Sequence, residues 1–492
     1  MRYLVSGRQM KEIDRFTIQE VGIPSLVLME RAALVVAREA GKAAGPGGRI
    51  LVAAGLGNNG ADAVAAARML KEQGHPVSVV LAGDPERGTE ELKLQVRIAE
   101  RLGVDTAEFA DFIPGRCEVL IDGVFGVGLN RPVEGNYAEF LRFLNTVQAG
   151  TVVAVDLPSG ISADTGAVLG PAVRADVTVT FGYEKFGTAV YPGKAYRGRL
   201  VVADAGFPQA AACHAGVSAF TYGEEDLCRL PARPPHSNKG TFGKVLVVGG
   251  RKHMAGAAYL AALGAYRAGA GLVKILSPEE NREILQTLLP EAVLIPWRED
   301  GPGTEELESL CKEASAVVLG PGLGRDEEAY GMARGVLSAA CSPVVLDADG
   351  LYAVAAHEEL TRYFTENIVI TPHMLEMARL IHVPLESVQE NMIAAAGDYA
   401  DRYGITCVLK DAATVVAGKD GSLYINGSGC PAMAKGGSGD VLSGVIAGLL
   451  AQGMDEAQGA TLGVYLHGLA GERAAKEKGE RAVLARDIAD AL

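Results

Sequence analysis

The chain has 492 residues, of which 48% are hydrophobic and 22% charged, and its formal net charge is −14. These values are typical of a globular protein with material for two hydrophobic cores. The acidic excess argues against binding through a broad basic surface, so we expect no nucleic-acid or membrane partner. No apolar run approaches the roughly 20 residues of a membrane span, and residues 1–10 lack the apolar core of a signal peptide. We therefore expect a soluble, cytoplasmic protein.

The cysteines are odd in number and widely spaced, with no CxxC pair of the kind used for zinc or redox chemistry. We expect them to be reduced and mostly structural. They are Cys117, Cys213, Cys228, Cys311, Cys341, Cys407 and Cys430.

The first half alternates between apolar strands and helices. Residues 1–48 are predicted to form a helical pair, followed by a strand over 50–54, a glycine loop and a helix that reaches Leu70. Further buried strands are predicted over 77–82, 119–122, 152–156 and 177–181. This is a doubly wound α/β pattern. Asp122 and Asp156 end two of these strands, where an open parallel sheet binds its ligands, although an Asp at this position can also simply cap a turn.

A proline-dense segment at 230–240 marks a domain boundary within 208–242. We divide the chain near 225, into domains 1–225 and 226–492. No short period recurs along the sequence, so two different α/β modules are expected.

The second half repeats the alternation. The run 243–250 is predicted to be a strand that leads into a glycine turn, and a small-residue helix through Ala270 follows it. Further strands are predicted over 272–276, 316–319, 344–347, 368–371, 406–409 and 414–417. The polar loops between them are 320–324, 347–350, 371–376 and 410–414. Each loop alone is as well explained by a turn or a cap. The order of the loops along the chain indicates a functional site more strongly than any one loop does.

The clearest functional signal is the run 435–450, a glycine-rich approach that leads directly into a helical pattern. Gly436, Gly437 and Gly439 allow successive N–H groups to converge on an anion at the positive end of the helix. Asp440 lies in the first turn, where a carboxylate could cap the helix or act as a base beside developing phosphate charge. The three preceding glycines favour the base.

The first half resembles the NAD(P)H-hydrate epimerase family through the segments 57–62, 122–132, 154–160 and 164–166. The resemblance implies an acid/base role for Asp156 with Lys185 assisting, and a potassium ion held by Asn59, Asp122 and Ser159. The implied hydrate-binding residues are Asn58, Asn59, Gly60, Ala61, Asp62, Gly126, Val127, Gly128, Leu129, Asn130, Arg131, Pro132 and Asp156. The chain departs from the family at Ala61, Ala63, Val127, Glu184 and Phe186.

The second half, from about Asn238 onward, resembles the NAD(P)H-hydrate dehydratase family, which has a ribokinase-like fold. By this resemblance Ala257, Gly322, His373 and Asp440 contact the hydrate. The implied nucleotide-binding residues are Lys410, Asp411, Ala412, Ala413, Thr414, Gly436, Gly437, Ser438 and Gly439. The departures here are Met374, Leu375 and Asp411.

Together the halves resemble the bifunctional NAD(P)H-hydrate repair enzymes. The expected fold is a Rossmann-like three-layer sandwich followed by a ribokinase-like domain, in a homo-oligomer. The expected substrates are hydrated NADH and NADPH (NADHX and NADPHX) together with ADP or ATP and magnesium, ADP being the expected nucleotide. Asp440 would take the hydroxyl proton while the glycine-run amides stabilise the transferred phosphoryl group.

Two alternatives remain open. The second half could be a kinase for a small vitamin alcohol, because the fold alone does not separate kinase from dehydratase. The first half could be a non-catalytic ligand-binding module, a reading raised by Ala61, Ala63 and Val127.

Overall fold

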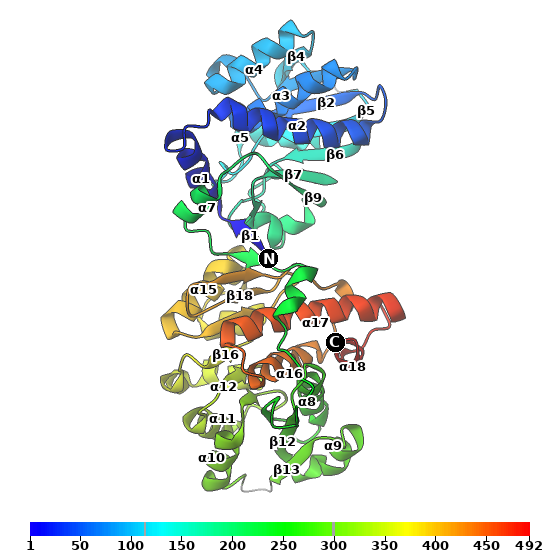
Figure 1. The fold of residues 1–492 in the computed structure, drawn as a ribbon. Coiled ribbons are helices and arrows are strands. Elements are labelled where there is room, and N and C mark those ends of the chain that lie inside the picture. Colours follow the sequence, from blue (N-terminus) through cyan, green and yellow to red (C-terminus); the bar gives the residue numbers. More distant parts are fainter. Residues whose placement is uncertain (113–114, 298–300) are drawn as a thin grey trace. The chain divides into compact units, whose positions relative to one another are not determined.

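The computed structural model describes residues 1–112, 115–297 and 301–492. The chain forms two compact units, shown in Figure 1, and each is described by itself. The N-terminal unit is Tyr3–Ala219, and the C-terminal unit is Phe220–Leu492 with Met1–Arg2.

The N-terminal unit is built on a parallel sheet with the strand order β4-β3-β2-β5-β6-β7-β9. Its strands are β2 (Ile50–Ala54), β3 (Val77–Leu81), β4 (Asp105–Glu108), β5 (Cys117–Gly123), β6 (Ala149–Val155), β7 (Val177–Phe181) and β9 (Arg199–Ala203). The strands predicted in this half are all present. The sequence analysis missed β4 and β9, which lie at the two edges of the sheet and are more exposed, so they do not form continuous apolar runs.

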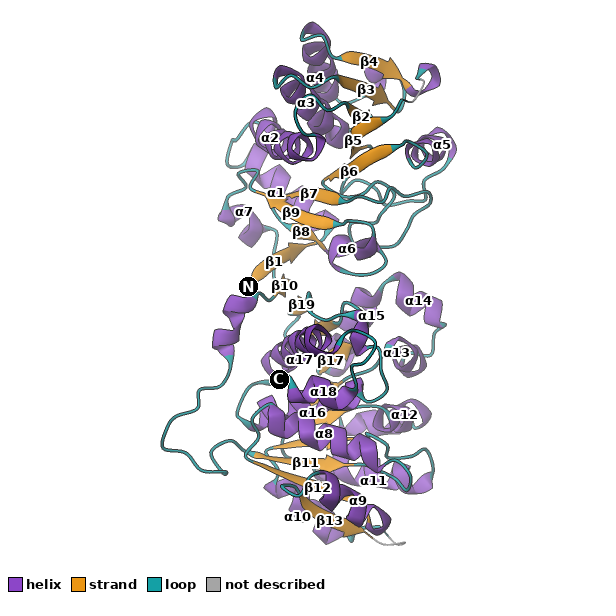
Figure 2. Cartoon of the chain, turned by 90° about the vertical axis from the view of Figure 1, so that its right-hand side faces the viewer, coloured by secondary structure: helices purple, strands orange, loops and turns teal. Residues whose placement is uncertain are grey.

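The helices of this unit cover both faces of the sheet. They are α1 (Gly7–Gln19), α2 (Ser25–Ala44), α3 (Asn58–Glu72), α4 (Glu90–Arg101), α5 (Gly135–Leu144), α6 (Phe186–Ala189) and α7 (Gln209–His214). Alternate residues of β2 point to opposite sides: Ile50 and Val52 pack with α2, α3 and α4, whereas Leu51 and Ala53 pack with α5. Figure 2 shows α2–α4 and α5 on opposite sides of these strands. The unit is therefore a three-layer α/β sandwich.

The prediction that residues 1–48 are helical is only partly right. Two helices, α1 and α2, are present, but they follow a strand, β1 (Arg2–Val5). Leu4 and Val5 of β1 pair in parallel with β8 (Glu184–Lys185). The partner lies about 180 residues away along the chain, so local sequence patterns could not reveal this strand.

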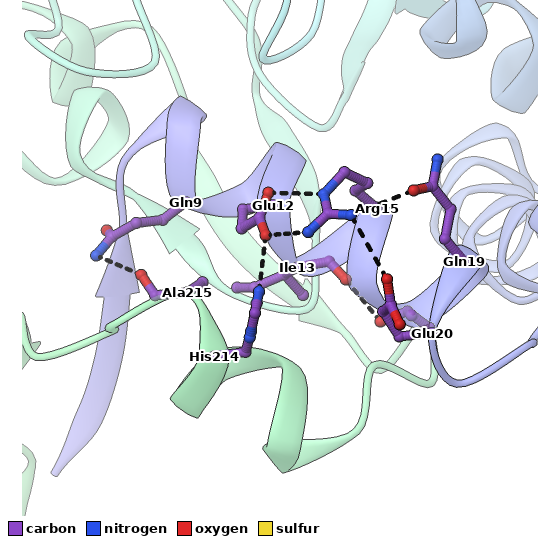
Figure 3. Close-up of polar contacts among 9 residues, drawn as sticks. Gln9, Glu12, Ile13, Arg15, Gln19, Glu20, His214 and Ala215 are labelled. Atoms are coloured by element: carbon purple, nitrogen blue, oxygen red, sulfur yellow. Dashed lines mark hydrogen bonds and ion pairs between the residues drawn. The ribbon is translucent and has the colours of Figure 1, made fainter.

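Helix α1 is held against α7 at the end of the unit (Figure 3). The His214 ring stacks on Phe16 with the ring centroids 4.5 Å apart, and its Nε2 lies 2.9 Å from Glu12 Oε1. Arg15 forms an ion pair with the same carboxylate and lowers the pKa of Glu12. Together these contacts fix the helix that carries Met10, Lys11 and Asp14.

The C-terminal unit has a larger mixed sheet with the strand order β13-β12-β11-β14-β15-β16-β17-β18-β19-β10. The neighbours from β13 to β17 are parallel, and β18 runs antiparallel to β17 and to β19. The strands are β10 (Phe220–Thr221), β11 (Lys244–Val248), β12 (Leu272–Pro278), β13 (Val293–Trp297), β14 (Ala316–Leu319), β15 (Val344–Leu346), β16 (Ile368–Ile370), β17 (Thr406–Leu409), β18 (Val415–Ala417) and β19 (Leu423–Ile425). Every strand predicted in this half is present, within three residues at each end. The sequence analysis missed β10, β13 and β19.

Helices cover both faces of this sheet as well. They are α8 (Ala255–Arg267), α9 (Arg282–Leu288), α10 (Thr304–Glu313), α11 (Glu327–Ala339), α12 (Asp349–Ala356), α13 (Met374–Leu380), α14 (Leu385–Glu390), α15 (Met392–Tyr403), α16 (Ser438–Ala451), α17 (Glu456–Lys478) and α18 (Ala485–Asp490). Helices α8, α16 and α17 share one core with the sheet, and Figure 1 shows α10–α12 on the other side of the strands. The predicted fold class is confirmed.

Helix α16 lies unusually close to α8, as its small residues predict. A Cβ added at Gly444 would lie 1.9 Å from the carbonyl oxygen of Ala261, and one at Gly448 would lie 2.7 Å from that of Ala265. This contact sets the position of the N-terminus of α16. Within the described ranges, no helix is long and apolar enough to cross a membrane.

Candidate functional sites

The N-terminal unit contains a cavity of about 550 Å³ that brings most of the predicted hydrate-binding residues together. The predicted residues that line it are Asn58, Asn59, Asp62, Gly126, Val127, Gly128, Leu129, Asn130, Arg131, Asp156 and Lys185. They come from the start of α3, the loop after β5, the residue that follows β6, and β8. A parallel sheet places these loops at one edge, which is why residues distant in sequence share one cavity.

The central polar contact of this cavity joins Asp156 and Lys185. Lys185 is fully buried, and its Nζ lies 2.5 Å from Asp156 Oδ1. The same ammonium donates to Thr180 Oγ1 at 2.9 Å and to the Phe181 carbonyl at 3.0 Å, so all three of its protons are used. Asp156 directly follows β6 and has a positive φ of 65°, a strained conformation that turns its side chain out of the strand. The pair is therefore a rigid carboxylate–ammonium group in the cavity wall.

Two further carboxylates line the cavity from its helical side. Asp62 lies on α3, and burial, followed by the charges of Asp156 and Asp14, raises its pKa well above the usual range. Asp14 lies on α1, and burial also raises its pKa. The sequence analysis missed Asp14, because its helix carries no motif that links it to the strand ends.

The predicted potassium ligands come from three elements: Asp122 lies at the end of β5, Asn59 in the first turn of α3, and Ser159 in the loop after β6. Asp122 is fully buried and accepts the Ser159 hydroxyl at 2.6 Å and the Ser159 N–H at 2.8 Å. Burial raises the pKa of Asp122 to about 6 despite these hydrogen bonds. The buried Asn59 amide nitrogen has no partner, and the Asn59 side chain lies next to Gly126. The three side chains offer oxygen atoms, which is the ligand type that a hard cation prefers. The unpaired Asn59 atom is a donor nitrogen and could not bind the cation itself.

The other predicted residues of this half are not among those that line the cavity. Ala61 is completely buried in the first turn of α3, where its N–H donates to the Gly57 carbonyl. Gly60 makes the close approach of that turn, since a Cβ there would lie 1.9 Å from the Gly55 carbonyl oxygen. Pro132 is exposed, at the end of its loop. The methyl of Ala61 therefore sits in ordinary helix rather than in a strained loop.

In the C-terminal unit, the glycine run forms the N-terminus of α16, as predicted. Gly437 is the residue before the helix and has φ +94°, a conformation that favours glycine. Asp440 lies in the first turn of this helix. Among the described residues, its carboxylate accepts no backbone N–H, so it does not act as a cap. Burial first, and then the charge of Asp347, raises the pKa of Asp440 to about 7. A carboxylate with this pKa can accept a proton near neutral pH.

Lys410 and Asp347 form an ion pair beside this helix terminus. Lys410 follows β17, Asp347 follows β15, and their Nζ and Oδ1 atoms are 2.8 Å apart. A Cβ built on Gly439 would lie 3.2 Å from Lys410 Nζ, so the ammonium lies against the first turn of α16. Although burial disfavours the charged form, Asp347 and Glu376 raise the pKa of Lys410. The sequence analysis gave Asp347 no role, because its position after a strand was the only feature that distinguished it.

His373 lies at the end of β16 and caps α13. Its Nδ1 accepts the N–H groups of Leu375 and Glu376, which leaves the proton on Nε2. The Glu376 carboxylate in turn accepts the His373 N–H at 2.8 Å. Burial and the charge of Lys410 lower the pKa of His373. The ring is half exposed, and its Nε2 lies 3.4 Å from Glu376 Oε1.

The remaining predicted residues lie in the loop after β14, in the first turn of α8, and in the segment after β17. Gly322, with φ +61°, lies against Ala257, since a Cβ on Gly322 would be 3.1 Å from that of Ala257. In the segment 410–414, Ala413 and Thr414 are buried, whereas Asp411 and Ala412 are exposed. Thr414 Oγ1 donates to the Asp411 carbonyl, which closes the turn.

Comparisons with known proteins cover nearly the whole chain. The model of the family described as NAD(P)H-hydrate dehydratase matches residues 245–492, and that of the family described as YjeF-related protein N-terminus matches residues 25–187. The chain is 38% identical over 513 aligned positions to the bifunctional NAD(P)H-hydrate repair enzyme Nnr of Moorella thermoacetica, covering 100% of this chain and 96% of that protein. It is 35% identical to the enzyme of the same name from Coxiella burnetii, covering 99% and 98%.

Among solved structures, the chain is similar to a ribokinase-like superfamily protein from Enterococcus faecalis. The two share 30% identity with a TM-score of 0.50, over 56% of this chain and 94% of that one. The predicted family resemblance is confirmed, and the chain belongs to the family of bifunctional NAD(P)H-hydrate repair enzymes.

Proposed function

We propose that this chain repairs hydrated NADH and NADPH. The N-terminal unit interconverts the R and S hydrates, and the C-terminal unit uses an adenine nucleotide, ADP in our proposal, to dehydrate the S form. The observation that carries this proposal is the position of Asp440 in the first turn of α16, beside Lys410 and with a pKa raised to about 7. The family membership of the whole chain supports both steps.

Dehydration requires a better leaving group than hydroxide. Asp440 would accept the proton of the hydrate hydroxyl while that oxygen attacks the terminal phosphoryl group of the nucleotide. The backbone N–H groups around Gly437 and Gly439 would stabilise the transferred charge. Phosphate then leaves with the electrons of the C–O bond, and loss of a proton from the adjacent ring carbon restores the double bond. His373 would donate from Nε2 to the hydrate.

Magnesium would be carried on the phosphate oxygens of the nucleotide, where it neutralises part of their charge. Lys410 and the segment 410–414 would contact the nucleotide from the end of β17.

Epimerisation would take place in the cavity of the N-terminal unit. Asp156 would exchange a proton with the hydrate, and Lys185 would hold this carboxylate in one orientation, which its 2.5 Å contact in the cavity wall supports. Asn59, Asp122 and Ser159 would hold potassium, which supplies positive charge for an anionic part of the ligand. Asp62 and the loop 126–131 would bind the rest of the hydrate.

The kinase alternative makes a different product. A small-molecule kinase would leave a stable phosphate ester, whereas the repair reaction restores NADH and its absorbance. The full-length similarity to repair enzymes favours dehydration. A non-catalytic N-terminal unit would bind the hydrate without converting R into S.

The test is an absorbance time course on mixed R and S NADH hydrate, with ADP and with ATP in turn, in the presence of magnesium and potassium. We expect full recovery of the NADH absorbance for the wild type. Asp156→Ala should stop at the S fraction, and Asp440→Asn should show no recovery. Phosphate-ester formation without recovery would contradict the dehydratase assignment. An Asp156→Ala protein that reaches full recovery would contradict the epimerase assignment.

We also propose a cellular location and an oligomeric state for the enzyme. The family resemblance supports a homo-oligomer, and the acidic, globular composition is consistent with a cytoplasmic protein. Light scattering after size-exclusion chromatography would give the oligomer size, and a monomer at micromolar concentration would contradict this part.

A further inference from the structure

The dehydratase site holds a buried ion pair between Asp347 and Lys410. The proposed mechanism uses Lys410 to contact the nucleotide but gives Asp347 no role. Asp347 is 2% exposed at its side chain, and Lys410 is 19% exposed. They come from different strands, β15 and β17, which are separated in the sheet by β16. A buried ion pair is weak evidence for stability, because the cost of desolvating both groups offsets their attraction. Its place beside a helix terminus that binds phosphate therefore suggests a functional reason.

The pair lies where the phosphoryl group would pass. Gly439 contributes to the N-terminus of α16, and a Cβ there would be 3.2 Å from Lys410 Nζ and 4.0 Å from Asp347 Oδ2. The 2.8 Å bond to Asp347 uses one of the three ammonium protons, and among the described residues no further hydrogen bond occupies the other two. A lysine side chain has a flexible four-carbon stem, and without an anchor its ammonium would sample many positions.

We propose that Asp347 is a positioning residue of the dehydratase: it holds the Lys410 ammonium against the first turn of α16, where the ammonium contacts the phosphoryl group during transfer. This inference rests on the proposed function of the same site. Asp347 acts through Lys410 and through its own charge on Asp440, and it need not contact the substrate.

The charges around Asp440 give the proposal a directional test. The carboxylates that act on Asp440 are Asp347, Asp349 and Glu376, and Lys410 is the opposing cation. Removing the charge of Asp347 lowers the proton affinity of Asp440, and removing the charge of Lys410 raises it. Because a base works in its deprotonated form, the acid limb of the kcat profile should move to lower pH in Asp347→Asn and to higher pH in Lys410→Met, each by about one unit.

The experiment measures kcat, the KM for nucleotide, and the pH profile of kcat on S-NADH hydrate for wild type, Asp347→Asn, Lys410→Met and the double variant. We expect each single variant to lose about 100-fold or more in kcat, and the double variant to be no slower than the slower single one. The matched control is Lys274→Met, which breaks the 2.8 Å pair with Glu313 at a similar exposure of the lysine, 20%, on β12. Its kcat and pH profile should equal those of the wild type.

Three results would overturn the inference: multiplicative losses in the double variant, acid limbs that move in the same direction, or Asp347→Asn within twofold of the wild-type kcat. The fluorescence of Trp297, which lies in this unit, reports folding of each variant. If Asp347→Asn does not fold, Lys410→Arg replaces it, because it keeps the charge but changes the geometry. It should lose kcat with the acid limb unmoved, and an unchanged kcat would also overturn the inference. A wild type that does not dehydrate the hydrate would instead refute the proposed function.

Discussion

Replacing Lys185 by Met should strongly destabilise the N-terminal unit. The substitution removes a fully buried ammonium and leaves Asp156, whose side chain is 7% exposed, without its cation. It also leaves Thr180 Oγ1 and the Phe181 carbonyl without this donor. Loss of one partner of a buried pair costs about 3–5 kcal/mol, because the other charge stays buried and unpaired. For a unit of this size the urea midpoint should fall by about 1–2 M.

The two units allow this effect to be located. Far-UV circular dichroism follows unfolding of the whole chain, whereas Trp297 is the one tryptophan of the sequence and lies in the C-terminal unit. The part of the circular dichroism change that comes from the N-terminal unit should shift to lower urea, while the tryptophan transition stays in place. Adding Asp156→Asn should recover a large part of the loss, since no charge is then buried alone. As a control, Lys42→Met removes an exposed partner of Glu39 and should leave the midpoint unchanged.

An unshifted midpoint for Lys185→Met would refute the reasoning about the buried pair. So would a double variant whose loss equals the sum of the two single losses, because the two residues would then not depend on each other.

Three further outcomes follow from the sites. The kcat of dehydration should fall as the pH drops below about 7, because Asp440 must be deprotonated and its pKa is raised to about 7; a pH profile that is flat from 6 to 8 would contradict this. Gly437→Ala should lower the free energy of unfolding, followed by tryptophan fluorescence in urea, by about 1–2 kcal/mol and weaken nucleotide binding, since the φ of Gly437 is +94°. Gly436→Ala should be near neutral, because a Cβ at Gly436 meets no atom within 4 Å. Gly60→Ala should abolish hydrate binding measured by calorimetry, because its Cβ would lie 1.9 Å from a backbone oxygen, whereas the neighbouring Gly57→Ala meets no atom within 4 Å and should still bind. Equal effects within either glycine pair would contradict the steric explanation.

The strand–loop–helix alternation could be predicted from the sequence alone. Strands buried on both faces of a parallel sheet appear as short apolar runs, and glycines mark the loops that follow them. The strand over 177–181 and the one over 406–409 have the predicted bounds in the structure. The start of α16 could also be predicted, because its glycines and the small residues along one face of the helix are local features of the chain. The order of these motifs along the chain was also enough to identify the family.

The strands that the sequence did not reveal depend on distant partners. β1 pairs with β8, and β10 pairs with β19 more than 200 residues later. Each of these strands has two to four residues, which is too short for a periodic signal. Their pairing is decided by the tertiary arrangement and not by local propensity.

The same distinction applies to the candidate sites. The sequence by itself determined which chemical groups end the strands: Asp122, Asp156, Asp347, His373 and Lys410. Only the tertiary structure decided which of them meet, because parallel strands bring residues together that lie far apart in the chain. Lys410 and Asp347 are 63 positions apart, yet 2.8 Å separates their charged atoms. Burial, which sets the proton affinities of such groups, likewise depends on every element packed around them and so exists only in the folded chain.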